Sequence, residues 1–248
     1  GQSVSISGNG QAFIAGAING DFAQSFEWND DDWQKKGREL YGDVGSSFGN
    51  SVSMTYSGNV IAVGAPGGRY TEAYKWNNDS WSLRGSRLRN FVPDSEFGYS
   101  VSISSNGDIF VVGAPGYDDA CEGNVYVYEW SELSSYEQKG ESIQGTGSND
   151  NAGSSVSLSN DGSILAYGSY ENSYEGANAR ILSWDGISWN QIGKAIPGRE
   201  NIEVALSSDG GTIAVGLPSN STEEISPRKV TVYSRKASFP KKRRVKVP

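Results

Sequence analysis

The residue types of this chain exclude most common forms of catalysis. The sequence has no histidine and one cysteine, Cys121, which excludes Ser-His-Asp and Cys-His nucleophiles and histidine-ligated metals. A glycosidase needs two carboxylates that face each other. Five short Ser/Val segments recur along the chain, and only the last carries an acid, Glu203. The other four have serine at that position: Ser3, Ser51, Ser100 and Ser155. One carboxylate cannot act as a pair, so we expect no enzyme and no catalytic residues.

Two acidic stretches carry oxygen ligands of the kind that Ca²⁺ prefers. One contains Asp118, Asp119 and Glu122, and the other is Asn29-Asp30-Asp31-Asp32. Neither has the D-x-D-x-D-G spacing of a calcium loop. We therefore favour solvated turns and expect no cofactor, with calcium at Asp118, Asp119 and Glu122 as the weaker alternative.

Paired aromatic residues recur five or six positions apart and could stack on sugar rings. A multivalent lectin would gain avidity from several weak sites of this kind. The simpler interpretation is that the aromatics pack one repeat against the next, and we favour it. The pairs are Trp28/Trp33, Trp76/Trp81, Trp130/Tyr136 and Trp184/Trp189, and the candidates for sugar stacking are Trp33, Trp81, Tyr136 and Trp189.

These residues belong to a repeat that occurs five times in the 248 residues. A valine opens each copy, a glycine follows twelve positions later, and a turn signal lies between them. Repetition with a period of 20–50 residues or slightly more indicates a repeat architecture. The valines are Val4, Val52, Val101, Val156 and Val204; the glycines are Gly16, Gly64, Gly113, Gly168 and Gly216; the turn signals are Asn9-Gly10, Gly58-Asn59, Asn106-Gly107, Asp161-Gly162 and Asp209-Gly210.

Each copy predicts four antiparallel strands. The Asn-Gly and Asp-Gly pairs favour tight primed turns, so the first two strands form a hairpin. The second strand is almost continuously apolar, as expected when both faces are buried. The aromatic pair marks a second hairpin. Such a sheet must stack on copies of itself, which predicts a single all-β domain, a β-propeller with five visible blades. We expect the blades at about 1–48, 49–97, 98–152, 153–200 and 201–248.

Two strings carry a resemblance to a known family. FGNSVSMTYSGNVIAVGAP (48–66) and FGYSVSISSNGDIFVVGAP (97–115) resemble FG-GAP repeats, the blades of integrin α-subunit propellers. The added aromatic pairs are similar to those of FG-GAP-like arrays in marine bacterial and algal surface proteins. The resemblance covers essentially the whole chain and implies adhesion or structural assembly. Integrin propellers have seven blades and a calcium loop between the first two strands. This chain shows five blades, with short turns in place of the loop.

Composition and two sequons set the expectations about membranes, nucleic acid and glycosylation. No apolar run is long enough to span a membrane, and the net charge of −8 argues against nucleic-acid binding. Asn78-Asp79-Ser80 and Asn220-Ser221-Thr222 are glycosylation sequons, so Asn78 and Asn220 are candidate sites. Gly1 lies in phase with the repeat, so we expect this chain to be a piece of a larger chain or assembly.

The basic segment 240–247 (PKKRRVKV) has two interpretations. It resembles a nuclear localisation signal. It also falls where the last strand of the fifth blade belongs, and lysine-rich edge strands resist aggregation. We favour the strand.

Together these patterns predict a non-enzymatic, extracellular or cell-surface propeller that meets protein partners or glycans through its loops and edge. The alternative function is a carbohydrate-binding lectin propeller. The alternative location is nuclear, if the basic segment is free.

Overall fold

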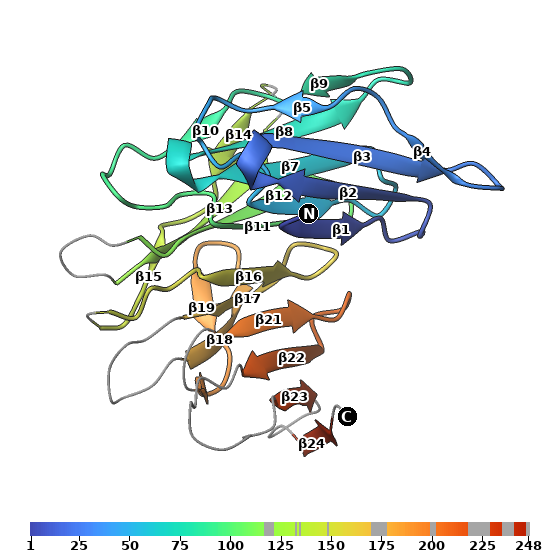
Figure 1. The fold of residues 1–248 in the computed structure, drawn as a ribbon. Helices are drawn as coiled ribbons and strands as arrows, with labels where there is room; N and C mark the ends of the chain where they lie inside the picture. The colour runs from blue at the N-terminus through green and yellow to red at the C-terminus, as the bar shows by residue number, and fades with distance from the viewer. Residues whose placement is uncertain are drawn as a thin grey trace, which may run out of the picture.

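The computed structural model describes residues 1–116, 122–131, 133, 135–147, 149–169, 178–198, 202–217, 229–234 and 241–246. Five antiparallel sheets follow one another along the chain (Figure 1), and each lies within one expected repeat. The helical segments of the described residues are two 3-10 turns, Ile18–Gly20 and Pro66–Gly68. The all-β, repeated-sheet fold class predicted from the period is confirmed.

The strands of each sheet are as follows. The first blade contains β1 (Ser3–Ile6), β2 (Ala12–Ala17), β3 (Phe22–Trp28), β4 (Trp33–Lys35) and β5 (Leu40–Tyr41). The second contains β6 (Ser51–Met54), β7 (Val60–Ala65), β8 (Tyr70–Trp76), β9 (Trp81–Leu83) and β10 (Leu88–Arg89). The third contains β11 (Ser100–Ile103), β12 (Ile109–Ala114), β13 (Asn124–Trp130), β14 (Tyr136–Gln138) and β15 (Ile143–Gln144). The fourth contains β16 (Ser155–Leu158), β17 (Ile164–Gly168), β18 (Asn178–Trp184), β19 (Trp189–Gln191) and β20 (Ile196–Pro197). The fifth contains β21 (Glu203–Leu206), β22 (Thr212–Leu217), β23 (Lys229–Ser234) and β24 (Lys241–Lys246).

The first hairpin of each blade differs from the primed turn expected. In the first blade the Gly10 N–H donates to the Ser7 carbonyl oxygen at 2.9 Å, and Gly10 has φ +72. Asn9 has no positive φ, and its Oδ1 accepts the Gln11 N–H at 3.0 Å. A type I′ turn needs positive φ at both central residues. The sequence therefore placed the turn correctly, but its geometry is a four-residue turn closed by one left-handed glycine.

The fourth strand of the first four blades is broken in two, which the expectation of four strands missed. In the first blade, β4 pairs with the end of β3, whereas β5 pairs with its start at Phe22 and Ala23. The break includes Gly37, whose φ of +74 interrupts extended backbone. In the fifth blade β24 runs unbroken against β23 from Lys241 to Lys246, with Arg244 at the register position of that glycine.

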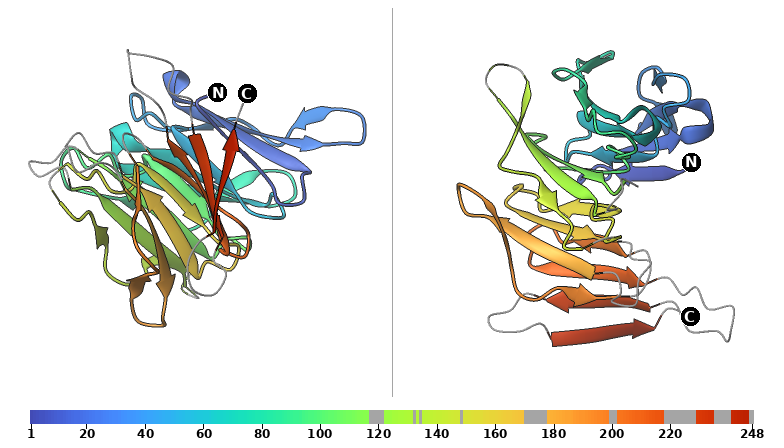
Figure 2. Two further views of the ribbon diagram at one scale, coloured as in Figure 1. Left: turned by 90° about the horizontal axis from the view of Figure 1, so that it is seen from below. Right: turned by 90° about the vertical axis from the view of Figure 1, so that its left-hand side faces the viewer.

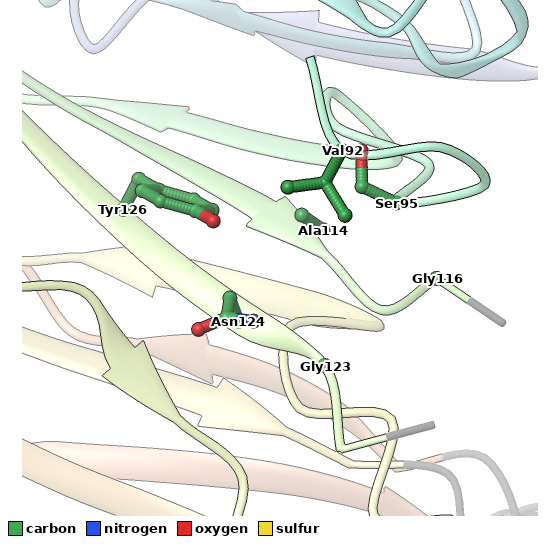
Figure 3. A pocket seen from close by; sticks show the side chains of 7 residues that line it. All are labelled: Val92, Ser95, Ala114, Gly116, Gly123, Asn124 and Tyr126. Carbon is green, nitrogen blue, oxygen red and sulfur yellow. The ribbon is translucent and has the colours of Figure 1, made fainter. Parts of the chain in front are cut away.

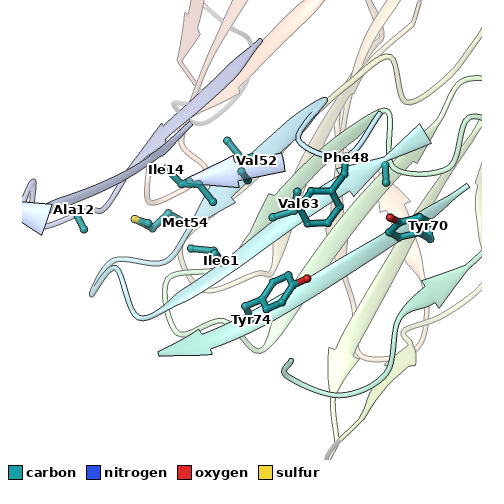
Figure 4. Packing of buried hydrophobic residues seen from close by; sticks show 11 residues of the cluster. Ala12, Ile14, Phe48, Val52, Met54, Ile61, Val63, Tyr70 and Tyr74 are labelled. Atoms are coloured by element: carbon teal, nitrogen blue, oxygen red, sulfur yellow. The ribbon is translucent and has the colours of Figure 1, made fainter. Parts of the chain in front are cut away.

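The hydrophobic core lies between neighbouring sheets. Strand β7 is buried at all of its positions. Its Ile61 and Val63 pack towards the first blade, in a cluster with Ile14 (Figure 4), while Val60 and Ala62 pack towards the third blade. Residues that alternate along one strand therefore serve two different interfaces. This explains why the second strands read as continuous apolar runs.

A glycine contact closes each joint between blades. A β-carbon on Gly16 would overlap the carbonyl group of Gly49 in the next blade, well inside van der Waals contact. The same holds for Gly64 with Gly98. The phenylalanines before these partner glycines, Phe48 and Phe97, are completely buried. The twelve-residue spacing from valine to glycine thus preserves a place where two backbones touch. The equivalent pairs are Gly113 with Gly153 and Gly168 with Ile202.

The stack of blades is an open arc in the described residues. The first strands lie side by side in the order β1, β6, β11, β16 and β21. The first blade and β24 stand at opposite ends of the arc (Figure 2). On β1 the side chains of Val4 and Ile6 are 71% and 62% exposed, whereas the equivalent Val52 on β6 is 7% exposed. No blade covers the outer face of β1 here.

Candidate interaction surfaces

The serines of the first strands join the blades. The Oγ of Ser53 accepts the Ile103 N–H of the next blade at 3.1 Å, and Ser102 Oγ accepts the Leu158 N–H at 3.1 Å. Glu203 occupies a serine position on β21 and is exposed at the end of the arc. These serines therefore hold neighbouring blades together. None of the equivalent positions in the other blades provides a second carboxylate for Glu203. The equivalent bonds join Ser3 to Val52, Ser5 to Met54, Ser155 to Val204 and Ser157 to Leu206.

The aromatic pairs of the second and third blades each receive a cation from the preceding blade. Lys36 Nζ lies 5.3 Å from the Trp76 ring and 5.8 Å from the Trp81 ring. Arg84 Cζ lies 4.4 Å from the ring of Trp130. Cation–π contacts of this kind are worth about 0.5–2 kcal/mol. Burial lowers the pKa of Lys36, and the neighbouring Glu27 opposes that shift. The fourth blade repeats the arrangement, with Lys139 Nζ 4.8 Å from Trp184.

Three of the four candidate stacking aromatics are tied into these joints. Trp81 Nε1 donates to Ser25 Oγ at 2.9 Å, and Trp189 Nε1 donates to the Lys139 carbonyl oxygen at 3.2 Å. Arg84 Cζ of the second blade lies 5.5 Å from the Tyr136 ring. Within its own blade the Tyr136 hydroxyl donates to the Gly107 carbonyl oxygen at 2.6 Å, and burial raises its pKa to about 12. Each polar group already has a protein partner, so these three rings act in packing.

Trp33, the fourth candidate, lies on β4 of the first blade. Its ring packs edge-on against Phe13 at 4.8 Å and against Trp28 at 5.4 Å. Trp28 is exposed. No cation–π contact to this pair occurs among the described residues. In the described residues the aromatic pair of the first blade is therefore uncovered, whereas a cation covers the equivalent pair in each of the next three blades.

A charge cluster around the buried Glu72 ties the first connecting loop to the second blade. Arg87 donates from Nε to Glu72 and from Nη1 to Asp43, both at 2.6 Å, and its guanidinium lies 3.8 Å from the Tyr70 ring. The hydrogen bond from Arg87 holds the pKa of Asp43 below its usual range. Tyr74 donates to Glu72 at 2.5 Å, and burial raises the pKa of Tyr74. All charges are paired, so the cluster fixes the loop.

The acidic stretches form no metal site in the described residues, where no three potential ligands converge. Asp118 and Asp119 lie outside the described residues. The Glu122 side chain accepts a hydrogen bond from Gln144 Nε2. In the other stretch, Asp32 Oδ1 accepts the Trp33 N–H at 2.7 Å, as in a solvated turn.

The sequons and the basic segment are only partly described. Asn78 is exposed in the turn between Trp76 and Trp81, with φ +71. Asn220 lies outside the described residues. Residues 241–246 of the basic segment form β24, paired along its length with β23. The backbone of this segment is therefore part of the last blade.

Large apolar side chains gather on neighbouring loops that connect one blade to the next. Tyr41, at the end of β5, and Val44, on the loop that follows it, are exposed between the first and second blades, and Phe91 and Val92 are exposed on the equivalent loop after the second. Both loops lie on the same edge of the arc (Figure 1). We call these four residues the loop edge. Where exposed apolar side chains form a contiguous patch, such a patch marks a protein contact surface.

A small pocket lies beside this edge (Figure 3). It measures about 110 Å³, and the buried Ser95 Oγ at its wall has no hydrogen-bond partner among the described residues. Sites for drug-sized ligands measure roughly 300 to 1,000 Å³. This pocket fits a few water molecules. It is lined by Val92, Ser95, Ala114, Gly116, Gly123, Asn124 and Tyr126.

Comparison with solved structures defines the class of the fold. Hydrazine synthase of Kuenenia stuttgartiensis is similar at TM-score 0.71 and 15% identity, over 99% of this chain and 65% of that one. A putative 6-phosphogluconolactonase of Bacteroides fragilis is similar at TM-score 0.66 and 13% identity, over 96% and 67%. A functionally unknown protein of Desulfotomaculum acetoxidans gives TM-score 0.64 and 13% identity, over 96% and 68%. The chain spans about two thirds of their length.

These likenesses and the five stacked sheets make the chain a β-propeller protein. The FG-GAP repeat family matches residues 92–128, which contain the second of the two strings that carry the resemblance. The chain is thus a repeat propeller with an FG-GAP repeat, and the expected resemblance is confirmed over residues 92–128. No curated protein matches its sequence.

Sequence reasoning missed the exposed faces and the charge cluster. Val4 and Ile6 match valines and apolar residues that are buried in later blades, and only their place in the first repeat distinguishes them. The loop edge lies in the variable part of the repeat, where residue types do not recur from one copy to the next. Glu72 and Arg87 carry no spacing signal, because equivalent positions hold unrelated residues.

Proposed function

We propose that this propeller is a non-enzymatic adhesion or assembly module exposed at the cell surface or outside the cell. The observation that carries the proposal is the loop edge, where Tyr41, Val44, Phe91 and Val92 expose apolar area on two adjacent connections. Interfaces are enriched in aromatic and apolar anchors of this kind. The FG-GAP repeat at residues 92–128 begins within this edge.

Three features support a binding role over catalysis. The sequence has no histidine. The described first strands use their serines to join blades, and Glu203 is the one acid at those positions. The described pocket beside the loop edge is too small for a typical substrate. The acidic net charge of −8 also argues against a nucleic-acid partner.

The function is tested by adhesion of coated beads to intact cells of the source organism. Phe91→Asp and Val44→Asp place a charge in the loop edge, and both sites are exposed, so the fold is preserved. We expect either variant to reduce bead adhesion. Ile187→Asp, at an exposed apolar site in the turn between β18 and β19, is the matched control. Equal adhesion of wild-type and albumin-coated beads, or antibody staining confined to the nucleus, would contradict the proposal.

A lectin function is the second candidate, and the open aromatic pair of the first blade favours it there. In the part of the chain that the structure describes, no cation covers Trp28 and Trp33 as one does in the next three blades. Glycan binding would then depend on Trp33 alone among the four candidates. A glycan array probed with wild type and with Trp33→Ala decides this: loss of a wild-type signal in the variant supports a lectin, and no wild-type signal excludes it.

A further inference from the structure

The second and third blades carry different residues at the start of their third strands. Tyr70 opens β8 and Asn124 opens β13, and each pairs with the last residue of the second strand of its blade. Ser46 and Ser95 are equivalent in the same way, because each lies two residues before the buried phenylalanine of its connecting loop. The two blades therefore show the same joint with a tyrosine and without one.

In the second blade the Tyr70 side chain fills the joint. It is fully buried (Figure 4), and its hydroxyl donates to Ser46 Oγ at 3.1 Å and accepts the Asp43 N–H at 2.8 Å. Its ring lies 6.4 Å from the Phe48 ring and 3.8 Å from the Arg87 guanidinium. The phenol group of Tyr70 and the hydroxyl of Ser46 thus satisfy each other inside the joint.

In the third blade the shorter Asn124 lies at the wall of the pocket of about 110 Å³ (Figure 3). Ser95 is 8% exposed, and its Oγ has no hydrogen-bond partner in the described part of the chain. A buried hydroxyl of this kind has lost its hydration, and a ligand that bonds to it recovers that loss. The serine that is satisfied by a tyrosine in the second blade is therefore unsatisfied in the third.

The walls of the pocket favour an aromatic ring. Val92, Ala114 and Tyr126 give it apolar and aromatic surface, and Tyr126 packs edge-on against the Phe97 ring at 5.4 Å. Ligand sites combine such walls with a few polar groups that fix orientation. An apolar cavity of about 150 Å³ holds benzene. This pocket is smaller, but Val92 is 48% exposed, so the pocket opens to the surface there and a flat ring can enter edge-first.

The polar groups around the pocket differ in their freedom to meet a ligand. Val92 N–H, at the position of Asp43 N–H, donates to Asn90 Oδ1 at 2.8 Å. Asn90 Nδ2 in turn donates to the Tyr126 hydroxyl at 3.0 Å. Ser95 Oγ is thus the buried wall group that remains to accept a hydrogen bond from a ligand hydroxyl.

We propose that this pocket binds the phenol side chain of a tyrosine from the protein partner of the loop edge. The ring takes the place that the Tyr70 ring fills in the second blade, and its hydroxyl donates to Ser95 Oγ. Val92 belongs both to the pocket wall and to the loop edge, so one partner covers the two surfaces together. Tyrosine is a common anchor of protein interfaces. This anchor rests on the proposed adhesion function and specifies how its partner is held.

NMR titration of the intact chain with p-cresol, which is the tyrosine side chain alone, tests the pocket. We expect p-cresol to shift the amide signals of Ser95, Asn124 and Tyr126. Ser95→Ala should weaken p-cresol binding about two- to tenfold, as the loss of one neutral hydrogen bond does. Toluene is the matched probe without a hydroxyl, and Ser95→Ala should not weaken its binding.

Asn124→Tyr should fill the pocket from within, as Tyr70 does in the second blade, and abolish p-cresol binding without lowering the thermal midpoint. Ile187→Tyr adds a ring at an exposed site in the turn between β18 and β19, and this matched control should bind p-cresol as wild type does. A wild type whose pocket signals do not respond to p-cresol overturns the proposal, as does p-cresol binding that Ser95→Ala leaves unchanged. The Ser95→Ala result decides even where Asn124→Tyr fails to fold.

Bead adhesion separates this proposal from the proposed function. Beads coated with Asn124→Tyr should adhere less than beads coated with Ile187→Tyr, because the partner's tyrosine no longer enters. Equal adhesion of the two variants would overturn a partner's tyrosine as the occupant and leave the adhesion function standing. Binding of p-cresol by a protein whose wild-type beads do not adhere would mean a site for a free phenol, which contradicts both.

Discussion

The carbonyl oxygen of Gly98 stands where the β-carbon of any larger residue at position 64 would lie. The two glycines belong to successive blades, and they let the backbone of β7 touch the segment that leads into β11. Neither backbone segment can shift easily, because both lie within a buried joint. The repeated glycine is therefore a packing requirement between blades rather than a turn signal.

Replacing Gly64 by alanine should destabilise the protein, because the added methyl group must push two blades apart. Overpacking of this kind costs about 1–3 kcal/mol. Urea denaturation measures the change in unfolding free energy. Gly216→Ala is the matched control, since its β-carbon meets only ordinary contact. Equal stability of the two variants would show that the joint is not close-packed.

Replacing Ser53 by alanine should leave the Ile103 N–H without its acceptor between the second and third blades. An unsatisfied buried donor costs about 1–3 kcal/mol. The thermal midpoint of Ser53→Ala should fall, while that of Ser142→Ala, at an exposed serine, should stay within error. A Ser53→Ala midpoint equal to wild type would mean that water replaces the serine.

Replacing Trp81 by phenylalanine should remove the Nε1 donor that bonds Ser25 Oγ and the Lys36 carbonyl. We expect a loss of about 1–2 kcal/mol in unfolding free energy, because the ring remains but the link to the first blade is lost. Trp28→Phe, at an exposed tryptophan of the same repeat position as Trp76, should be nearly neutral. A larger loss of unfolding free energy in Trp28→Phe than in Trp81→Phe would mean that Trp28, rather than Trp81, is the ring that stabilises the fold.

Acid should weaken the loop held by Arg87 and Asp43. The folded-state pKa of Asp43 lies below its ordinary value, so this carboxylate stabilises the fold above the unfolded-state pKa. That contribution is lost as pH falls through the folded-state pKa, below about pH 4. Denaturation of wild type and Asp43→Asn should differ at pH 7 and converge at low pH. A difference that is constant with pH would exclude the ion pair as its source.

Much of the fold could be predicted from the sequence, because the joint requirements repeat. Gly16 and Gly64 recur since every joint needs them, and the apolar run of β7 marks a strand buried on both faces. Strand β24 was found by laying the fifth repeat on the fourth. The broken fourth strand was missed because Gly37 interrupts pairing that resumes only at the two residues of β5.

The interaction surfaces could not be predicted in the same way. A repeat pattern shows what neighbouring copies share, whereas the exposure of a residue depends on which of its faces another described blade covers. Val4 and Val52 have the same sequence setting, yet one is 71% and the other 7% exposed. The roles of Lys36 and Arg84 were also hidden, because a cation before a glycine carries no sign that its target lies in the following blade.

Amide hydrogen exchange on the first strands tests most directly whether serine hydrogen bonds join neighbouring blades. The N–H groups of Val52 and Met54, bonded to Ser3 and Ser5, provide the internal reference for a covered strand. The account predicts slow exchange at Val52 and Met54, whose N–H groups are bonded to serines of the preceding blade, and fast exchange at Val4 and Ile6, whose face is exposed in the described structure. Equally fast exchange at all four amides would contradict the account.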